Sequence, residues 1–245
     1  MARKPVKKSV QTASKVPAGD PKHAARATRS AGRKTRSSLL DGASRLFKER
    51  GLAGASISDI AAAADAFPSQ ITYYFRTKEA LFVEAACRDM LYVAREAEGA
   101  ALKADTPRDY TRALVESVTA TDSVAFFAEA LTLTRRRQDL APLVERTIER
   151  LHGEGLRAYA GQIERHGWNT LRDPDTTSRR FWAVAIGVMV EGYAMGRSPD
   201  ELCSEMLRVL GEQATTKPVG DSAHLHLVGE RDASRSSSSE AETSS

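Results

Sequence analysis

Residues 56–78, with the sequence SISDIAAAADAFPSQITYYFRTK, have the pattern of two short helices joined by a tight turn. Ser56 is placed to cap the first helix, because its hydroxyl can accept a hydrogen bond from the backbone N–H of Asp59, whose carboxylate can reach back to Ser56. Apolar side chains then recur at a spacing of three and four residues, at Ile57, Ile60, Ala61 and Ala64. The spacing predicts a short amphipathic helix that begins immediately after Ser56.

The second helix is predicted to begin at Pro68. Residues 65–67 interrupt the alanine run, and proline has a fixed φ and no N–H donor, which suits the first turn of a helix. Ile71, Tyr74 and Phe75 fall on one face of this helix, and Ser69, Gln70, Thr72 and Tyr73 fall around the other. A helix this short with a polar outer face is suited to enter the major groove of DNA.

Side chains on the polar face predict particular DNA contacts. Gln70 is the predicted base reader, because its amide can pair with N6 and N7 of adenine, and Ser69 and Thr72 can add single hydrogen bonds or a methyl contact to thymine. The other hydroxyl and ammonium groups are predicted to contact phosphates, with a core position as the alternative for Tyr74. The full predicted set of DNA-contacting residues is Ser56, Pro68, Ser69, Gln70, Thr72, Tyr73, Tyr74 and Lys78.

The remainder of the chain favours an all-α architecture. Of its 245 residues, 41% are hydrophobic, which is enough to bury a substantial core. Helical spacing continues through residues 35–213, and strand signals are nearly absent. The expected elements are a helix from Thr35 that Gly51 ends, helices at about 78–104, 107–120, 122–137, 140–166, 178–196 and 199–211, and a polar loop at 169–177. Small residues on one stripe of the helix at 178–196, among them Gly192, should allow another helix to approach closely.

The charge is distributed unevenly along the chain. Residues 1–36 contain eleven Lys and Arg residues and one acid, a net charge of about +10, so the other 209 residues sum to about −6 and the whole chain to +4. Residues 1–33 carry almost no large apolar side chains, and residues 214–245 are rich in Ser and Glu, so both segments are predicted to be disordered. The basic segment is either a solubilising tail or an arm that binds phosphates.

Several other classes of protein lack support in the sequence. Cys87 and Cys203 form no C-x-x-C pair, so no disulfide framework is expected and a reducing cytoplasm fits. The N-terminus lacks the apolar segment of a secretory signal, and the longest apolar run, residues 181–190, is short of the roughly 20 residues that span a bilayer. Glu149 and His152 supply only half of a di-iron motif. Phosphate loops, nucleophile elbows and metal-ligand spacings are missing, so no enzymatic activity, cofactor or metal is expected.

Several motifs in order resemble the tetracycline-repressor-like (TetR/AcrR) family of transcriptional regulators, over residues 35–81. The motifs are a Leu-Phe-x-x-x-Gly phrase (Leu46, Phe47, Gly51), an Ile-Ala pair (Ile60, Ala61), a Tyr-x-Phe (Tyr73, Phe75) and a Lys-Glu-x-Leu (Lys78, Glu79, Leu81). Two positions depart from the pattern, because Asp65 stands where the family usually has a turn glycine and Thr72 replaces the first aromatic residue of a pair. The pattern of base contacts is therefore expected to differ from that of other members.

The resemblance implies a repressor that a small apolar or aromatic ligand releases from a palindromic DNA operator. It divides the chain into a basic arm (1–33), a helix-turn-helix DNA-binding domain (34–80), a helical ligand-sensing and dimerisation domain (81–213) and a tail (214–245). The homodimer would form through the helices at about 178–196 and 199–211, and Phe127, Trp182 and Tyr193 are the predicted ligand contacts. The alternative is a non-specific architectural DNA-binding protein, which would share the basic arm without needing the large helical body.

Overall fold

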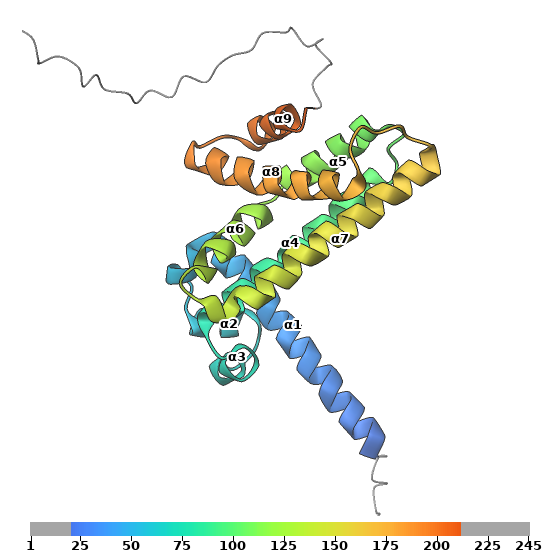
Figure 1. Ribbon diagram of the computed structural model, residues 1–245. Helices are drawn as coiled ribbons and strands as arrows, with labels where there is room; N and C mark the ends of the chain where they lie inside the picture. The colour runs from blue at the N-terminus through green and yellow to red at the C-terminus, as the bar shows by residue number, and fades with distance from the viewer. Residues whose placement is uncertain (1–20, 212–245) are drawn as a thin grey trace, which may run out of the picture. The chain divides into compact units, whose positions relative to one another are not determined.

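The computed structural model describes residues 21–211, with side chains from Ser30 onward, and every regular element in this range is a helix (Figure 1). The elements are α1 (Pro21–Gly54), α2 (Ile57–Ala63), α3 (Pro68–Phe75), α4 (Lys78–Ala101), α5 (Pro107–Thr119), α6 (Ser123–Thr134), the 3₁₀ turn η1 (Gln138–Leu140), α7 (Ala141–His166), α8 (Pro174–Ala194) and α9 (Pro199–Val209). The predicted all-α fold class is confirmed.

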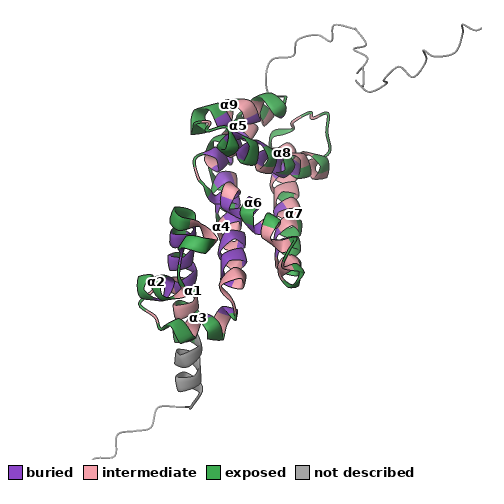
Figure 2. Cartoon of the chain, turned by 90° about the vertical axis from the view of Figure 1, so that its left-hand side faces the viewer, coloured by how far each residue is buried: buried purple, intermediate pink, exposed green. Residues whose placement is uncertain are grey.

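Helix α4 is the central element of the fold. Helices α1, α5, α6 and α7 all pack against it, and buried side chains occupy its length from Leu81 to Ala101. Figure 2 shows α2 and α3 near one end of α4, whereas α5, α8 and α9 lie near the other. Because only two residues separate the end of α3 from the start of α4, the position of α3 depends directly on the position of α4.

The first helix and the helical body share one hydrophobic core. Phe47 of α1 packs edge-on against Phe82 of α4, with ring centroids 5.0 Å apart, and Phe82 packs in the same way against Phe126 of α6 at 4.9 Å. Such aromatic pairs contribute about 0.5–1.5 kcal/mol beyond the area that they bury. Helices α1, α4 and α6 are therefore packed as one continuous unit.

The first helix begins earlier than predicted. α1 starts at Pro21, so residues 21–33 of the predicted disordered arm are helical, and residues 1–20 and 212–245 lie outside the described range. The early segment is rich in Ala and Arg, which favour helix once a longer helix is anchored by packing further along. At Gly51 the backbone leaves the helical conformation, with φ 69° and ψ 174°, as the predicted helix end requires, before a last helical turn to Gly54.

The eighth helix also begins earlier than predicted. Asp173 caps it, because its carboxylate accepts a hydrogen bond from the N–H of Thr176 at 3.0 Å, and Pro174 occupies the first turn. The predicted loop at 169–177 therefore ends at Asp173. The signal was present in the sequence as an Asp-Pro pair, which marks a helix start as readily as it marks a loop.

Helices α8 and α9 approach closely at a glycine, as predicted. A Cβ built on Gly192 would lie 2.0 Å from Cδ2 of Leu202, which is itself fully buried. Any larger residue at 192 would therefore force the buried Leu202 side chain to move. Within residues 21–211, no helix combines the length and the apolar character that crossing a bilayer requires.

Candidate functional site

Helix α2 and the turn after it have the geometry that the sequence predicted. Ser56 Oγ accepts a hydrogen bond from the N–H of Asp59 at 3.0 Å, and Asp59 Oδ2 accepts one from the N–H of Ser56 at 3.3 Å. These hydrogen bonds hold the pKa of the Asp59 carboxyl below its usual value. Asp65 adopts φ 50°, the left-handed conformation that asparagine and aspartate tolerate better than most residues. Aspartate thus supplies the turn geometry that a glycine would otherwise provide.

Gln70 has a structural role at the start of α3. The backbone N–H of Phe67, the residue that precedes the helix, donates to Gln70 Oε1 at 2.9 Å. This hydrogen bond satisfies one of the N–H groups that a helix start leaves unpaired. A Gln side chain that pairs with adenine uses both its oxygen and its NH2 group. In Gln70 the oxygen already accepts one bond and keeps one further lone pair, whereas the NH2 group donates to no described residue and is free for a base.

The other polar residues of α3 lie on its solvent face. Ser69, Thr72 and Tyr73 are exposed, and Tyr73 retains 80% of its accessible surface, whereas Ile71 and Phe75 are buried. Tyr74 is half-buried, and its ring packs edge-on against that of Tyr73 at 4.9 Å. A Cβ built on Gly32 of α1 would lie 3.2 Å from the Tyr74 hydroxyl, so Tyr74 lies between the solvent face and α1.

Phe67 is a functional candidate that the sequence reasoning missed. It keeps 74% of its surface exposed at the start of α3, next to the exposed Pro68. An exposed ring at the end of a polar helix face is suited to contact the methyl group of thymine. The available signal was the presence of a large aromatic residue in a turn that otherwise holds only Asp and Ala.

Lys78 holds α4 against the start of α2. Its Nζ donates to the carbonyl oxygen of Ala55 at 3.1 Å, and the side chain is half-buried. An ammonium group has three donors, so this contact leaves others for a phosphate. Lys78 therefore ties the start of α4 to Ala55, the residue immediately before the capping residue Ser56.

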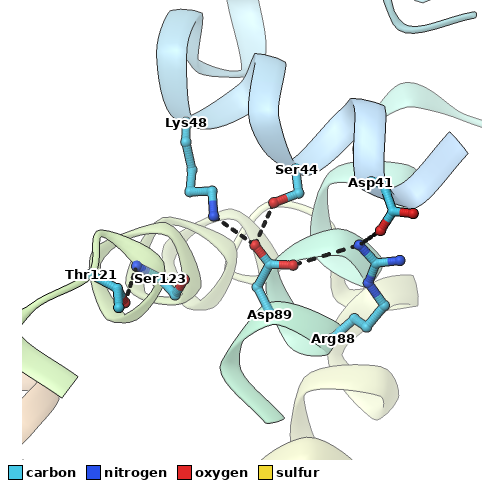
Figure 3. Close-up of polar contacts among 7 residues, drawn as sticks. All are labelled: Asp41, Ser44, Lys48, Arg88, Asp89, Thr121 and Ser123. Carbon is cyan, nitrogen blue, oxygen red and sulfur yellow. Dashed lines mark hydrogen bonds and ion pairs between the residues drawn. The ribbon is translucent and has the colours of Figure 1, made fainter. Parts of the chain in front are cut away.

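A polar cluster fixes α1 on α4 (Figure 3). Asp89 of α4 accepts hydrogen bonds from Ser44 Oγ and from Lys48 Nζ, the latter at 2.8 Å, and the Asp89 side chain is only 13% exposed. Beside it, Arg88 of α4 pairs with the exposed Asp41 of α1 at 2.8 Å. The two helices are thus joined by charged hydrogen bonds as well as by their apolar contact.

The same two helices also contact α3. Arg36 of α1 pairs with Glu84 of α4, and its guanidinium lies 5.0 Å from the centroid of the Phe75 ring in α3. This distance is within the range of a cation–π interaction. Helices α1 and α4 together therefore hold α3 in place, and the polar face of α3 stays exposed.

The body contains a cavity of about 240 Å³, which α4 lines with Ala94 and Glu98 in its second half, whereas Glu84 near its start contacts Arg36. Its wall is formed by residues of α4, α5, α7 and α8, by the segment between α7 and α8 and by Leu210 at the end of α9, and it is mostly apolar. Residues that line it include Ala94, Glu98, Tyr110, Leu114, Tyr159, Arg172, Arg180, Phe181 and Trp182.

Of the three predicted ligand contacts, the structure brings Trp182 to the cavity wall. Phe127 is completely buried in the core between helices. Tyr193 lies at the end of α8, where its hydroxyl donates to Asp122 Oδ1 at 2.7 Å and its ring lines a separate open groove beside α6. Aromatic character alone did not separate a cavity wall from a core position.

In the described part of the chain, no three His, Cys, Asp or Glu residues come close enough to hold a metal ion. The half-motif residue His152 instead has its Nδ1 3.2 Å from the guanidinium of Arg179. Burial, followed by the charge of Arg179, lowers the pKa of His152.

Comparisons with known proteins match both parts of the chain. Residues 39–85 match the model of the bacterial regulatory proteins of the tetR family, and residues 107–211 match that of the bacterial transcriptional repressor C-terminal region. A crystal structure from Rhodococcus sp. RHA1, described as a transcriptional regulator, is 37% identical, with a TM-score of 0.65 over 72% of this chain and 95% of that one. A search of curated proteins found no match.

Two more distant structures share the fold. One, from Mesorhizobium loti MAFF303099 and described as a TetR-family transcriptional regulator, is 17% identical, with a TM-score of 0.59 over 74% of this chain and 95% of that one. The other, a complex of SmeT with triclosan, is 20% identical, with a TM-score of 0.51 over 72% of this chain and 88% of that one.

Proposed function

The chain belongs to the TetR family of bacterial regulatory proteins, and we propose that it is a homodimeric repressor that a small, largely apolar ligand releases from a palindromic DNA operator. The observation that carries the proposal is the position of α4. One end of this helix supports α3, and the other end forms part of a cavity wall. A ligand that displaces α4 would therefore displace α3.

The exposed face of α3 supports the DNA-binding part. Ser69, Thr72 and Tyr73 are exposed for bases and phosphates, and Phe67 and the NH2 group of Gln70 extend this surface. Ser56, Pro68, Tyr74 and Lys78 complete the proposed contact set at its edges. Because Thr72 stands where the family usually has an aromatic residue, the operator sequence is expected to be particular to this protein.

The last two helices support the homodimer. Val190, Tyr193 and Met195 of the α8 end and Val209 of α9 keep 40% or more of their surface exposed, and a second copy that packs on these two helices would cover them. The DNA requires the same symmetry, because one short helix reads too few base pairs. Two copies of α3 about 34–36 Å apart would read two half-sites on one face of the duplex.

The cavity supports the ligand, because it is apolar, lined by aromatic rings and formed by four helices. SmeT, which has the same fold, was crystallised in complex with triclosan. Action in the cytoplasm, where bacterial DNA lies, follows from the same proposal.

Selection of binding sites from random DNA fragments tests the DNA-binding part. A repressor of this type should select a palindrome whose half-sites are about one helical turn apart. The alternative, an architectural protein, would select no defined sequence and would protect random genomic DNA evenly. Enrichment of a single motif supports the proposal, and even enrichment of all fragments supports the alternative.

Deletion of residues 1–20 is expected to leave folding intact and to reduce the salt dependence of DNA binding. This segment carries five Lys or Arg residues and precedes α1, so its removal preserves every described helix. The slope of log K against log salt should fall by about 0.9 for each DNA phosphate that the segment neutralises in the full-length protein. Fluorescence anisotropy with labelled operator at several salt concentrations measures it. An unchanged slope would assign the segment to a solubilising tail.

Ligand and operator are expected to weaken each other's binding by the same factor. A ligand that prefers the DNA-incompetent state about 100-fold shifts the equilibrium by about 2.7 kcal/mol, and reciprocity requires operator to lower ligand affinity equally. Trp182 lines the cavity, and Trp168 packs against Tyr110, another residue of the cavity wall. Tryptophan fluorescence therefore reports whether a ligand occupies the cavity. Ligands found by screening are titrated with and without operator DNA. If the ligand affinity is the same with and without operator DNA, the protein binds the ligand without being regulated by it.

A further inference from the structure

We propose that the effector is a compact organic cation with an apolar body, and that Glu98 is the residue that recognises its positive charge. The inference rests on the proposed function and adds the chemical class of the ligand. It concerns the cavity between α4, α5, α7 and α8, where Glu98 is the one carboxylate on the wall in the described part of the chain.

Glu98 is a half-buried carboxylate that forms no ion pair with any residue of 30–211, although Arg157 lies near enough to act on its charge. No basic group of residues 30–211 lies within ion-pair distance of it, whereas Glu84 on the same helix pairs with Arg36, and Glu154 on α7 pairs with Arg150 at 2.7 Å. Burial raises the pKa of the Glu98 carboxyl, the neighbouring Glu154 raises it further, and Arg157 opposes both. Removing a carboxylate from water without a partner is costly. A bound cation would supply the direct ionic contact that Arg157 does not make.

Aromatic rings surround the same space. The rings of Tyr110 and Tyr159 lie 5.6 Å apart on the cavity wall, and Phe181 and Trp182 form an edge-to-face pair at 5.0 Å on the α8 side. The faces of such rings attract cations, and most strongly so when water is excluded. A carboxylate within an aromatic wall is the combination that selects an ammonium group over a neutral group of the same size.

Two arginines also line the cavity, and they favour an anion instead. Arg180 donates its NH2 group to the carbonyl oxygen of Val209 at 2.8 Å, so part of its hydrogen-bonding capacity is already used. Arg172 is exposed in the segment that precedes α8, where water screens its charge. Glu98 is less solvated than Arg172, so its field inside the cavity is less screened.

The size of the cavity limits the ligand. At about 240 Å³ it is slightly below the usual range of about 300–1,000 Å³ for ligand pockets. One aromatic ring with a short chain fits this space.

Three probes that differ in one group test the charge preference on the full-length protein. They are 4-phenylbutylamine, a cation at neutral pH, its neutral alcohol 4-phenylbutanol, and the anion 4-phenylbutyrate. Quenching of tryptophan fluorescence measures each affinity without DNA. We expect the amine to bind about tenfold more tightly than the alcohol, the size of a cation–π and charge contribution in a partly desolvated site.

Substitution of Glu98 by Gln is the decisive variant, because it removes the charge and keeps the shape. In Glu98→Gln the amine should lose its advantage and bind like the alcohol, while the affinity of the alcohol stays unchanged. Glu96→Gln is the matched control, since Glu96 is exposed on α4 and does not line the cavity. It should retain the preference for the amine.

Three results would overturn the proposal. They are tightest binding by the butyrate, a preference for the amine that survives in Glu98→Gln, and no measurable binding of any probe. The proposed regulatory function fails separately. If the amine binds through Glu98 but leaves operator affinity unchanged, the cavity does select for positive charge. The proposal that its ligand releases the protein from DNA would then be wrong.

Discussion

Substitution of Gln70 by Glu is expected to lower operator affinity by about 10- to 100-fold while leaving the stability of the fold unchanged. Glu at this position keeps the oxygen that accepts the N–H of Phe67, and Glu and Gln are equivalent as the third residue of such a helix start. Glu lacks the NH2 group, so the hydrogen bond that Gln70 would donate to a base is lost. Loss of a good base contact costs about 1–3 kcal/mol.

Gln70→Ala separates the two roles of this side chain. Alanine removes both the capping oxygen and the base contact, so this variant should lose operator affinity and also about 0.5–1.5 kcal/mol of stability, the usual contribution of one hydrogen bond. Chemical denaturation measures the stability of both variants, and anisotropy measures DNA binding. A loss of stability in Gln70→Ala that is absent from Gln70→Glu would assign the capping role to the oxygen.

Because the new carboxylate also repels phosphates, affinity must be measured on the selected operator and on random DNA. A contact to a base lowers the ratio of the two affinities, whereas repulsion lowers both alike. If Gln70→Glu binds the operator as tightly as the unmodified protein, Gln70 only caps α3. The exposed Ser69, Thr72 and Tyr73 would then be left to read the sequence.

Substitution of Asp89 by Asn is expected to destabilise the protein by about 1.5–3 kcal/mol and to weaken operator binding. The carboxylate accepts from Ser44 and Lys48 at a site with little solvent exposure, and hydrogen bonds to charged groups contribute about this much. Asn keeps the size of the side chain but leaves Lys48 without its charged partner. Because this cluster fixes α1 on α4, a looser contact also lowers the precision with which α3 is held.

Asp41→Asn is the matched control for Asp89. Asp41 pairs with Arg88 across the same two helices, but its side chain is 67% exposed. Exposed ion pairs contribute about 0–1 kcal/mol, so this variant should unfold close to the midpoint of the unmodified protein. Urea denaturation with the slope compared across variants gives both values. Equal losses in the two variants would contradict a special role for Asp89.

Local signals in the sequence account for most of the secondary structure. The hydrogen bonds that cap α2 and the proline that starts α3 act between residues at most three positions apart, so the sequence displays both partners together. The start of α8 was missed, although Asp173 and Pro174 carry the same kind of signal. The early start of α1 was missed because low apolar content was interpreted as disorder, whereas Ala and Arg extend a helix that is anchored elsewhere.

The order of the helices and the helix-turn-helix were predictable from the sequence, because turns, caps and apolar stripes depend on neighbours within one or two helical turns. Which side chain of one helix meets which other helix depends on how all the helices pack together. Asp89 lies 41 residues from Lys48 along the chain, and Phe127 and Trp182 are alike in sequence pattern, yet one lies in the core and the other on a cavity wall. Helical periodicity shows which face of a helix is apolar. Whether a side chain on that face fills the core or lines a cavity depends on how closely several helices pack around it.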